Sequence, residues 1–462
     1  MDRKTFADEA TLEDAYQLLE QSLLHYEGRP VGTIASLDPR APAENYRDCF
    51  VRDFVSAAFV LLLDGRGEVV RDFLSLILRL RGQQEELEGQ QLAPGVLPAS
   101  FKVVTLDNGV EEIFADFGDR AIGRVAPVDS MMWWAVLLRA YVSCTGDTAF
   151  AHTPEVQRGL RMILSLCLQS RFEVFPTLLV PDGSFMIDRR MGVNGHPIEI
   201  QALFDATLDA ADLLVQDEAN RWLVELSHRR RHVLREYVRR YYWLDMHALN
   251  RIHRFNTEMF GHEVDNVFNI YPESIPGWVA DWVPDEAGYL LGNVGPGRMD
   301  FRFFSQGNLL AALFGLADEE QAGQIMRTFE QRWDDLIGLM PLKIVFPAIE
   351  NHEWRLMTGS DPKNTPWSYH NGGNWPVLIW PFVAAALRAG RRDLAEKAVA
   401  AMEKRAMPDA WAEYYDGRHG RLIGRRANLH QVWSASGYIL AIKLLEAPEN
   451  LAKLGLTEDG KE

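Results

Sequence analysis

Two kinds of helical segment alternate along the sequence, and this alternation constrains the fold more than any other feature. Residues 321–338 and 391–405 each carry one apolar stripe and one charged face, whereas residues 301–316 and 374–389 are apolar nearly all round. A helix of the first kind lies at a surface, and a helix of the second kind is enclosed on most sides. The chain therefore builds layers in which covering helices protect enclosed ones.

A hydrophobic period of 3.6 residues predicts a series of twelve helices and few strands. They span residues 11–26, 47–63, 67–87, 127–145, 153–170, 197–214, 217–245, 300–316, 318–338, 375–389, 391–405 and 430–446. Amphipathic and enclosed segments roughly alternate. Six such hairpins predict an all-α fold, an (α/α)6 barrel that spans residues 1–462 as one domain. A helical solenoid is the competing architecture, but no fixed repeat period supports it.

The connections between these helices are unequal in length. The long ones, 88–126, 171–196, 246–299 and 339–374, are rich in Gly, Pro, Trp and Asn, and the short ones are 64–66, 215–216, 317 and 390. Long ordered loops in a compact domain usually carry function. In a ring of hairpins they would gather at one end, around its mouth.

Composition narrows the class of partner. The net charge of −17 argues against nucleic acid and anionic membranes, and it also disfavours a phosphorylated or carboxylated substrate. Cys49, Cys144 and Cys167 are odd in number, which excludes a disulfide framework. The charged start has no secretory signal, and no apolar run is long enough for a bilayer. We expect a soluble cytoplasmic protein that binds a neutral ligand.

The long loops combine aromatic rings with carboxylates, amides and arginines, which is the mixture that sugars need. Hydrolysis of a glycosidic bond requires two carboxyl groups on opposite sides of that bond. The candidates are Asp53, Asp129, Asp188, Glu199, Asp300, Glu353 and Glu413. For each one alone, a salt bridge or a helix cap is the more common role. Glu199 lies near a predicted helix start, and Asp300 with Arg302 could clamp the start of helix 300–316.

Asp188 and Glu413 have the settings that packing explains least well. Asp188 follows the apolar run 185–187, which limits solvation and favours the protonated acid. In an extended loop Arg190 would face the same way as Asp188 and would lower its pKa, unless Arg190 points at substrate hydroxyls or meets another carboxylate. Glu413 stands among Trp411, Tyr414 and Tyr415.

Other site chemistries have little support. His228 and His232 have the spacing of a metal pair, but the three arginines between them disfavour a cation. Residues 292–297 lack the spacing of a dinucleotide-binding loop, and residues 434–437 lack that of a serine-esterase turn. We expect no metal and no cofactor.

The same loops resemble the alkaline/neutral invertases, glycoside hydrolase family 100. The resemblance runs from about Asp38 to Leu445 and is carried by NY…CFVRDF (45–54), DFGDRAIGRVAPVDSMMWW (116–134), DGSFMIDRRMG (182–192), MDFRFFSQGN (299–308), EWRLMTGSDPKNTPWSYHNGGNWP (353–376) and WAEYYDG (411–417). It departs from the family pattern at Ala412 and at Asn428, His430 and Val432, which puts the leaving-group subsite in question.

The resemblance implies an (α/α)6-barrel enzyme that hydrolyses sucrose to glucose and fructose without a metal. It implies that Asp188 is the proton donor, that Glu413 is the base and that the reaction inverts the glucosyl carbon, with the two carboxyl groups about 6.5–9.5 Å apart. It also implies a homo-oligomer such as a hexamer. A hydrolase of another α-glucoside, such as trehalose, and a non-catalytic sugar-binding protein are the alternatives.

Side chains around the predicted mouth complete the expected site. We expect the glucosyl ring to stack on Trp134, Trp367 or Trp375. Its hydroxyl groups are expected to meet Asp53, Arg190, Gln201, Asp300, Arg302 and His370.

Overall fold

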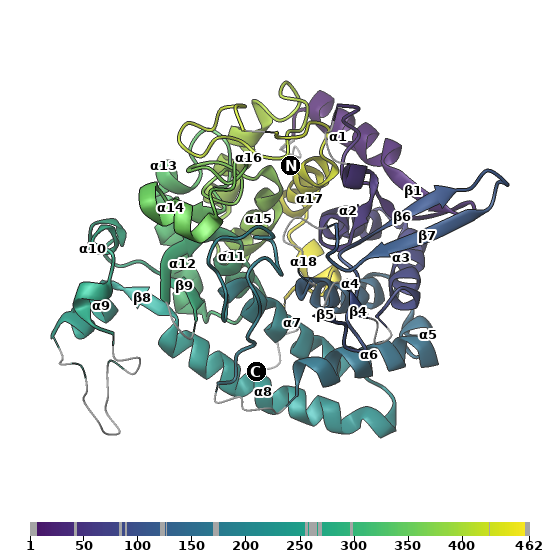
Figure 1. The fold of residues 1–462 in the computed structure, drawn as a ribbon, viewed down its shortest axis with the longest axis horizontal. Coiled ribbons are helices and arrows are strands. Elements are labelled where there is room, and N and C mark those ends of the chain that lie inside the picture. The colour runs from purple at the N-terminus through teal and green to yellow at the C-terminus, as the bar shows by residue number, and fades with distance from the viewer. Residues whose placement is uncertain are drawn as a thin grey trace, which may run out of the picture.

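Six buried helices form the centre of the molecule (Figure 1). The computed structural model describes residues 7–40, 44–82, 86–87, 90–120, 125, 127–169, 175–254, 257, 266, 270–295, 299–424 and 426–457. The central helices are α2 (Val51–Leu63), α4 (Asp129–Thr145), α7 (Ile198–Leu214), α11 (Ser305–Phe314), α15 (Ile379–Arg388) and α17 (Val432–Glu446). Each packs against the next in chain order, and α17 packs back against α2, so that the six form a closed ring.

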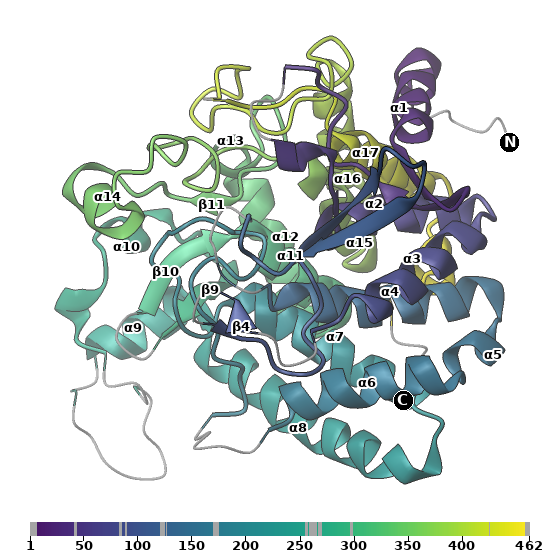
Figure 2. The same ribbon diagram turned by 45° about the vertical axis from the view of Figure 1, so that its right-hand side comes forward.

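A second set of helices covers this ring from outside. Its members are α1 (Glu9–Gln21), α3 (Gly67–Arg79), α6 (Pro154–Cys167), α8 (Arg221–Tyr241), α12 (Glu319–Gln331) and α16 (Arg392–Glu403). Helix α1 packs on α17, α3 on α4, α8 on α7, α12 on α11 and α16 on α15. Figure 2 shows α6 and α8 together along the lower edge of the molecule. The predicted division into enclosed and covering helices is confirmed.

The arginine-rich helix α8 has a structural role that the sequence did not reveal. Arg231 and Arg235 pair with Asp205 of α7, whose side chain is fully buried. Arg235 also donates to the carbonyl oxygen of Phe314 at 3.1 Å, and Arg239 donates to that of Leu316 at 2.8 Å. These carbonyls stand at the negative C-terminal end of α11, where cations are stabilising. The arginines therefore fasten an outer helix to two inner ones.

Short elements occupy the connections. The helices are α5 (Thr148–Ala151), α9 (Met246–Arg254), α10 (Trp278–Trp282), α13 (Trp333–Leu336), α14 (Asn351–Thr358) and α18 (Asn450–Lys453). The strands are β1 (Leu23–Tyr26), β2 (Arg29–Thr33), β3 (Cys49–Phe50), β4 (Glu86–Leu87), β5 (Gln90–Gln91), β6 (Ser100–Thr105), β7 (Glu111–Asp116), β8 (Trp243–Asp245), β9 (Gly288–Val294), β10 (Met299–Phe304) and β11 (Val345–Phe346). None of the described helices is long and apolar enough to cross a bilayer.

These strands correct the all-α prediction in the connections. Strands β11, β10, β9 and β8 form an antiparallel sheet in that order, and β3, β6 and β7 form another. Residues 300–304 were predicted to begin a helix but belong to β10, and α11 starts only at Ser305. The aromatic residues of β10 favour a strand, and pairing on both sides outweighs the helical period. Asp300 and Arg302 therefore do not cap α11.

Backbone contacts join the long connections to one another. Isolated bridges pair Ser36 with Gln431 and Pro197 with Asn293, and Asn374 pairs with both Lys343 and Tyr415. Gln431, Pro197 and Asn374 come shortly before the inner helices α17, α7 and α15. These bridges therefore bring segments from different connections to the starts of three inner helices.

The contact between α7 and α11 depends on a glycine. A Cβ atom at Gly307 would lie 2.4 Å from Ile198 Cγ2 and 2.9 Å from the backbone nitrogen of Glu199. Real carbon atoms do not approach so closely, and the atoms in the way belong to a packed helix start. Gly307 therefore allows the two inner helices to touch where α7 begins.

We predict that Gly307→Ala lowers the free energy of unfolding by about 1–3 kcal/mol because the added methyl group overpacks this contact. The measurement is thermal or denaturant unfolding of the full chain. Gly323→Ala is the matched control, since its Cβ in α12 would meet nothing within 4 Å and the change should stabilise the helix by roughly 0.5–1 kcal/mol. Equal effects of the two substitutions would contradict the close packing of α7 and α11.

Candidate active site

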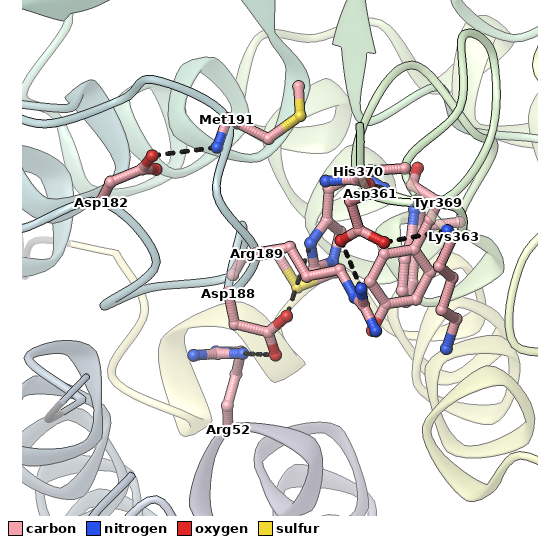
Figure 3. A network of polar contacts seen from close by, with 12 residues as sticks. Arg52, Asp182, Asp188, Arg189, Met191, Asp361, Lys363, Tyr369 and His370 are labelled. Atoms are coloured by element: carbon pink, nitrogen blue, oxygen red, sulfur yellow. Dashed lines mark hydrogen bonds and ion pairs between the residues drawn. The ribbon is translucent and has the colours of Figure 1, made fainter. Parts of the chain in front are cut away.

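Asp188 ends a buried apolar segment and reaches a polar cluster (Figure 3). Met186 and Ile187 are each 1% exposed, whereas the side chain of Asp188 is 24% exposed. Its Oδ2 lies 3.5 Å from Arg52 Nη1, and its Oδ1 lies 3.5 Å from His370 Nδ1. The carboxyl group therefore has few protein partners and remains partly accessible.

The surroundings favour a protonated Asp188. Burial raises the pKa of Asp188 to about 6, and the charge on Glu413 works in the same direction. Three cations, Arg52, Arg189 and Lys363, oppose this rise without cancelling it. A carboxyl group with such a pKa can donate a proton near neutral pH, as a general acid must.

Arg190 does not create the difficulty that the sequence suggested. The loop is bent and not extended, so residues do not alternate as predicted. Arg190 is exposed, and its Nη2 donates to the carbonyl oxygen of Leu356 at 3.3 Å. Arg189 pairs with Asp361 (Figure 3). The cation nearest to the Asp188 carboxylate is Arg52 instead.

Glu413 is held by several donors. It is 2% exposed, its Oε1 accepts from the Tyr46 hydroxyl at 2.8 Å, and its Oε2 accepts from Asn428 N at 3.2 Å and Asn428 Nδ2 at 3.1 Å. The Lys363 ammonium lies 3.6 Å from the same Oε2. Both oxygens of this carboxyl group therefore have partners that fix its position. Asn428, one of the departures from the family pattern, therefore contacts this carboxylate directly.

Lys363 joins the two acids into one electrostatic cluster. Its Nζ donates to the Tyr46 hydroxyl at 3.1 Å and lies 4.0 Å from the centre of the Tyr369 ring. Burial lowers the pKa of Lys363, while the charges of Glu413 and Asp188 both raise it. Both acids thus act on the same ammonium group, although they are far apart in sequence.

The loops that carry these groups are locked together by backbone contacts. Gly417 N donates to the carbonyl oxygen of Trp367 at 2.8 Å, and a Cβ at Gly417 would lie 1.7 Å from Gly372 O. Tyr369 on one loop and Trp411 on the other adopt left-handed backbone angles, with φ of 49° and 51°. Such angles cost about 1–3 kcal/mol each outside glycine, and they persist only where surrounding contacts fix them.

Comparison with known proteins assigns the chain to a family. A family model described as alkaline and neutral invertase matches residues 15–448. The cytosolic invertase 1 of Oryza sativa subsp. japonica is 51% identical over 449 residues, which cover 96% of this chain and 80% of that protein. This chain belongs to the alkaline and neutral invertase family. It is accordingly a glycoside hydrolase.

Other comparisons extend the likeness. Alkaline/neutral invertase CINV2 of Arabidopsis thaliana is 48% identical over 99% of this chain and 82% of its own length. Among solved structures, a GH63 mannosylglycerate hydrolase from Thermus thermophilus in complex with glucose has a TM-score of 0.54 at 12% identity, covering 93% of this chain and 99% of that one. A bacterial glucoamylase complexed with acarbose also has a TM-score of 0.54, covering 96% and 57%. At such low identity these structures show the fold alone.

In this invertase-family protein, two predicted sugar contacts join the acids. Asp53, in the first turn of α2, is half-buried. Burial raises the pKa of Asp53 to about 8, and the charges of Asp188 and Glu413 contribute to that rise. His370 is 1% exposed beside Asp188, and burial lowers the pKa of His370 well below its ordinary value, so its ring is neutral.

Three other predicted contacts lie in the packed interior. Trp134 is fully buried, and its indole nitrogen donates to the carbonyl oxygen of Leu74 at 3.1 Å. The Gln201 amide is also fully buried and bonds to both backbone groups of Leu178. Trp375 is 1% exposed and stacks between His370 and Tyr414. The polar atoms of these three side chains have hydrogen-bond partners within the protein, and the side chains are covered. Trp134 and Gln201 therefore stabilise the core, and Trp375 packs against the ring of His370.

Three further predicted contacts line a cavity that the two acids do not line. Asp300, Arg302 and Trp367 line a space of about 1050 Å³ that also includes Glu350 and Glu353 but neither Asp188 nor Glu413. Arg302 Nε donates to Asp300 Oδ1 at 2.8 Å. Trp367 Nε1 donates to Glu350 Oε1 at 2.6 Å. These residues do not join the acids around Lys363.

Sequence reasoning missed several members of the cluster. Tyr46 and Arg52 lie within a stretch that it singled out, but only Asp53 was selected there. Lys363 stands in an irregular loop, where no periodicity marks a buried residue. Within the described part of the chain, no group of three or more His, Cys, Asp or Glu side chains has a metal-binding arrangement.

We predict that Lys363→Met moves the alkaline limb of the pH profile of kcat/KM to higher pH. Loss of a positive charge raises the pKa of Asp188, so this acid keeps its proton longer as the pH rises. The measurement is initial rates of sugar release across pH. Lys404→Met, at an exposed position on the outside of the fold, is the control and should leave the limb in place. A limb that moves to lower pH in Lys363→Met would contradict the electrostatic role of this ammonium group.

Proposed function

We propose that this chain is a single (α/α)6-barrel domain that hydrolyses sucrose to glucose and fructose with inversion at the glucosyl carbon. The observation that carries the proposal is the pairing of two different carboxyl environments around Lys363. Asp188 is partly accessible with a raised pKa, and Glu413 is buried among hydrogen-bond donors. Two carboxyl groups in contrasting environments are the usual basis for assigning a general acid and a general base.

In this mechanism Asp188 gives its proton to the glycosidic oxygen. The bond from the glucosyl carbon to that oxygen breaks, the bonding electrons stay with the oxygen, and fructose leaves. A water oxygen attacks the glucosyl carbon from the opposite face while Glu413 takes one of its protons. One water molecule is consumed, and the enzyme is restored when the proton returns from Glu413 to Asp188 through solvent.

Nearby residues suit the supporting roles. Three hydrogen bonds and the Lys363 ammonium hold the Glu413 carboxyl group in one position, which suits a base that takes a proton from a water molecule in a defined place. Asp53 and His370 are proposed to bind glucosyl hydroxyl groups because they share the cluster with Asp188. Asp300, Arg302 and Trp367 are not assigned a glucosyl contact in this proposal, since they line a cavity that contains neither Asp188 nor Glu413.

We also propose a cytoplasmic location and a homo-oligomeric assembly. The first agrees with the name of the rice relative, although another similar protein, alkaline/neutral invertase C of Arabidopsis thaliana, is named mitochondrial. The second follows the family resemblance and has size-exclusion chromatography with light scattering as its direct measurement.

We predict that the first glucose released from sucrose is the β-anomer. Sucrose is an α-glucoside, and a single displacement by water inverts the anomeric carbon. Proton NMR during the first turnovers, before mutarotation, measures the anomer. Initial α-glucose would mean retention and would contradict the assigned roles. Parallel assays of glucose release from sucrose and trehalose distinguish an invertase from a hydrolase of another α-glucoside.

We predict that Glu413→Gln lowers kcat by about 10²–10⁴-fold, because the amide cannot take the proton from water. The substituted side chain keeps its shape, so calorimetry should still detect sucrose binding. Glu396→Gln on the outer helix α16 is the control and should retain wild-type turnover. A non-catalytic sugar-binding protein would show no turnover even in the wild type.

A further inference from the structure

Two further carboxyl groups, those of Asp129 and Glu199, are buried near Arg52. Asp129, in the first turn of α4, is fully buried, and Glu199, in the first turn of α7, is 2% exposed. Arg52 Nε donates to Asp129 Oδ2 at 2.5 Å. Asp129 Oδ1 is buried and has no hydrogen-bond partner in the described structure. A buried carboxylate oxygen without a donor costs free energy, so this atom requires an explanation.

Glu199 can supply the missing donor. Its Oε1 accepts from Met186 N at 3.1 Å and from Gln306 Nε2 at 3.2 Å. Burial raises the pKa of Glu199 to about 8, and the charge of Asp129 contributes the next largest increase. Glu199 is therefore protonated near neutral pH, and a protonated carboxyl group has one O–H donor. Helices α4 and α7 pack directly against each other and carry the two carboxyl groups in their first turns.

We propose that Glu199 donates its proton in a hydrogen bond to Asp129 Oδ1, and that this singly charged carboxyl pair positions Asp188. The inference rests on the proposed role of Asp188 as the acid. The pair reaches Asp188 by two routes. Glu199 accepts from the backbone nitrogen of Met186, and the carbonyl oxygen of the same residue accepts from Asp188 N at 3.0 Å. Asp129 accepts from Arg52, which lies 3.5 Å from Asp188 Oδ2.

The shared proton also determines the net charge of the Asp129–Glu199 pair, which acts on Asp188. Glu199 is acted on by the charges of Asp129, Arg52 and Asp188, and Asp188 is acted on by Arg52, Arg189, Lys363 and Glu413. With the proton in place, Arg52 meets one negative charge on its inner side instead of two. Arg52 still attracts the Asp188 side chain and so keeps it in place. This attraction is too weak to cancel the rise in the pKa of Asp188 that burial causes.

Infrared spectroscopy tests the proton without using activity. The wild-type spectrum minus that of Glu199→Gln, near neutral pH, should contain the C=O stretching band of a protonated carboxyl group. Asp53→Asn is the matched control, because it removes a different carboxyl group with a raised pKa and should leave the Glu199 band in place. Absence of a lost band in Glu199→Gln overturns the proposal.

The pH profile of kcat/KM for sucrose tests the positioning role. Glutamine has the charge and the donor of a protonated glutamate, so Glu199→Gln should leave the alkaline limb at its wild-type pH. Glu199→Leu loses the acceptor for Met186 N and should lower kcat by about 100-fold through misplacement of the acid. Asp129→Asn removes the charge that offsets Arg52, which lowers the pKa of Asp188 and moves the alkaline limb to lower pH.

Two outcomes overturn this role. The first is an alkaline limb of kcat/KM that moves to lower pH in Glu199→Gln, which is the effect expected if a negative charge were lost. The second is an alkaline limb that stays at its wild-type pH in an Asp129→Asn variant that folds. Thermal unfolding identifies variants that fail to fold. If Glu199→Leu or Asp129→Asn does not fold, the infrared band and the pH profile of Glu199→Gln test the proposal. If the wild type does not cleave sucrose at all, the proposed function fails, while the infrared band still reports on the shared proton.

Discussion

The contact that closes the helical ring, between α17 and α2, is the constraint on which the rest of the structure depends. Ser56 and Ser436 share a buried hydrogen bond of 2.7 Å across it, and Val432 N donates to the carbonyl oxygen of Ala35 at 3.0 Å. Helix α2 carries Arg52 in its first turn, and the loop before α17 carries Glu413. Without this contact the N-terminal and C-terminal parts of the site would not meet.

The site itself is a region of low solvation in which each charge depends on its neighbours. Asp188 and Asp53 have raised pKa values mainly because they are buried, and the surrounding cations do not cancel that effect. Glu413 has donors on both of its oxygens. Environment, and not residue type, therefore distinguishes the proposed general acid from the proposed general base.

The family and most of the helices could be predicted from the sequence, and the reason is physical. Each predicted helix is present because burial of an apolar stripe or of a whole helix imposes a 3.6-residue period. The predicted helices were wrong at five short segments that form strands instead, residues 23–26, 49–50, 86–87, 243–245 and 300–304. Strand pairing is a non-local interaction that leaves little periodic signal in such short segments. Asp188 and Glu413 were singled out because their neighbours in sequence are unusual, and both act electrostatically on Lys363 in the structure.

The sequence by itself determined which segments are helices, which of them are enclosed and which loops carry the acids, because these properties follow from local patterns of polarity. Only the tertiary structure decided which side chains meet. Trp134 and Gln201 looked like sugar contacts but are satisfied within the core, whereas Lys363 and Asn428 lie against Glu413. These four contacts join residues 15 to 60 positions apart. The ring that holds them in place is closed by pairs such as Ser56 and Ser436, which are 380 positions apart. No local pattern encodes either kind of contact.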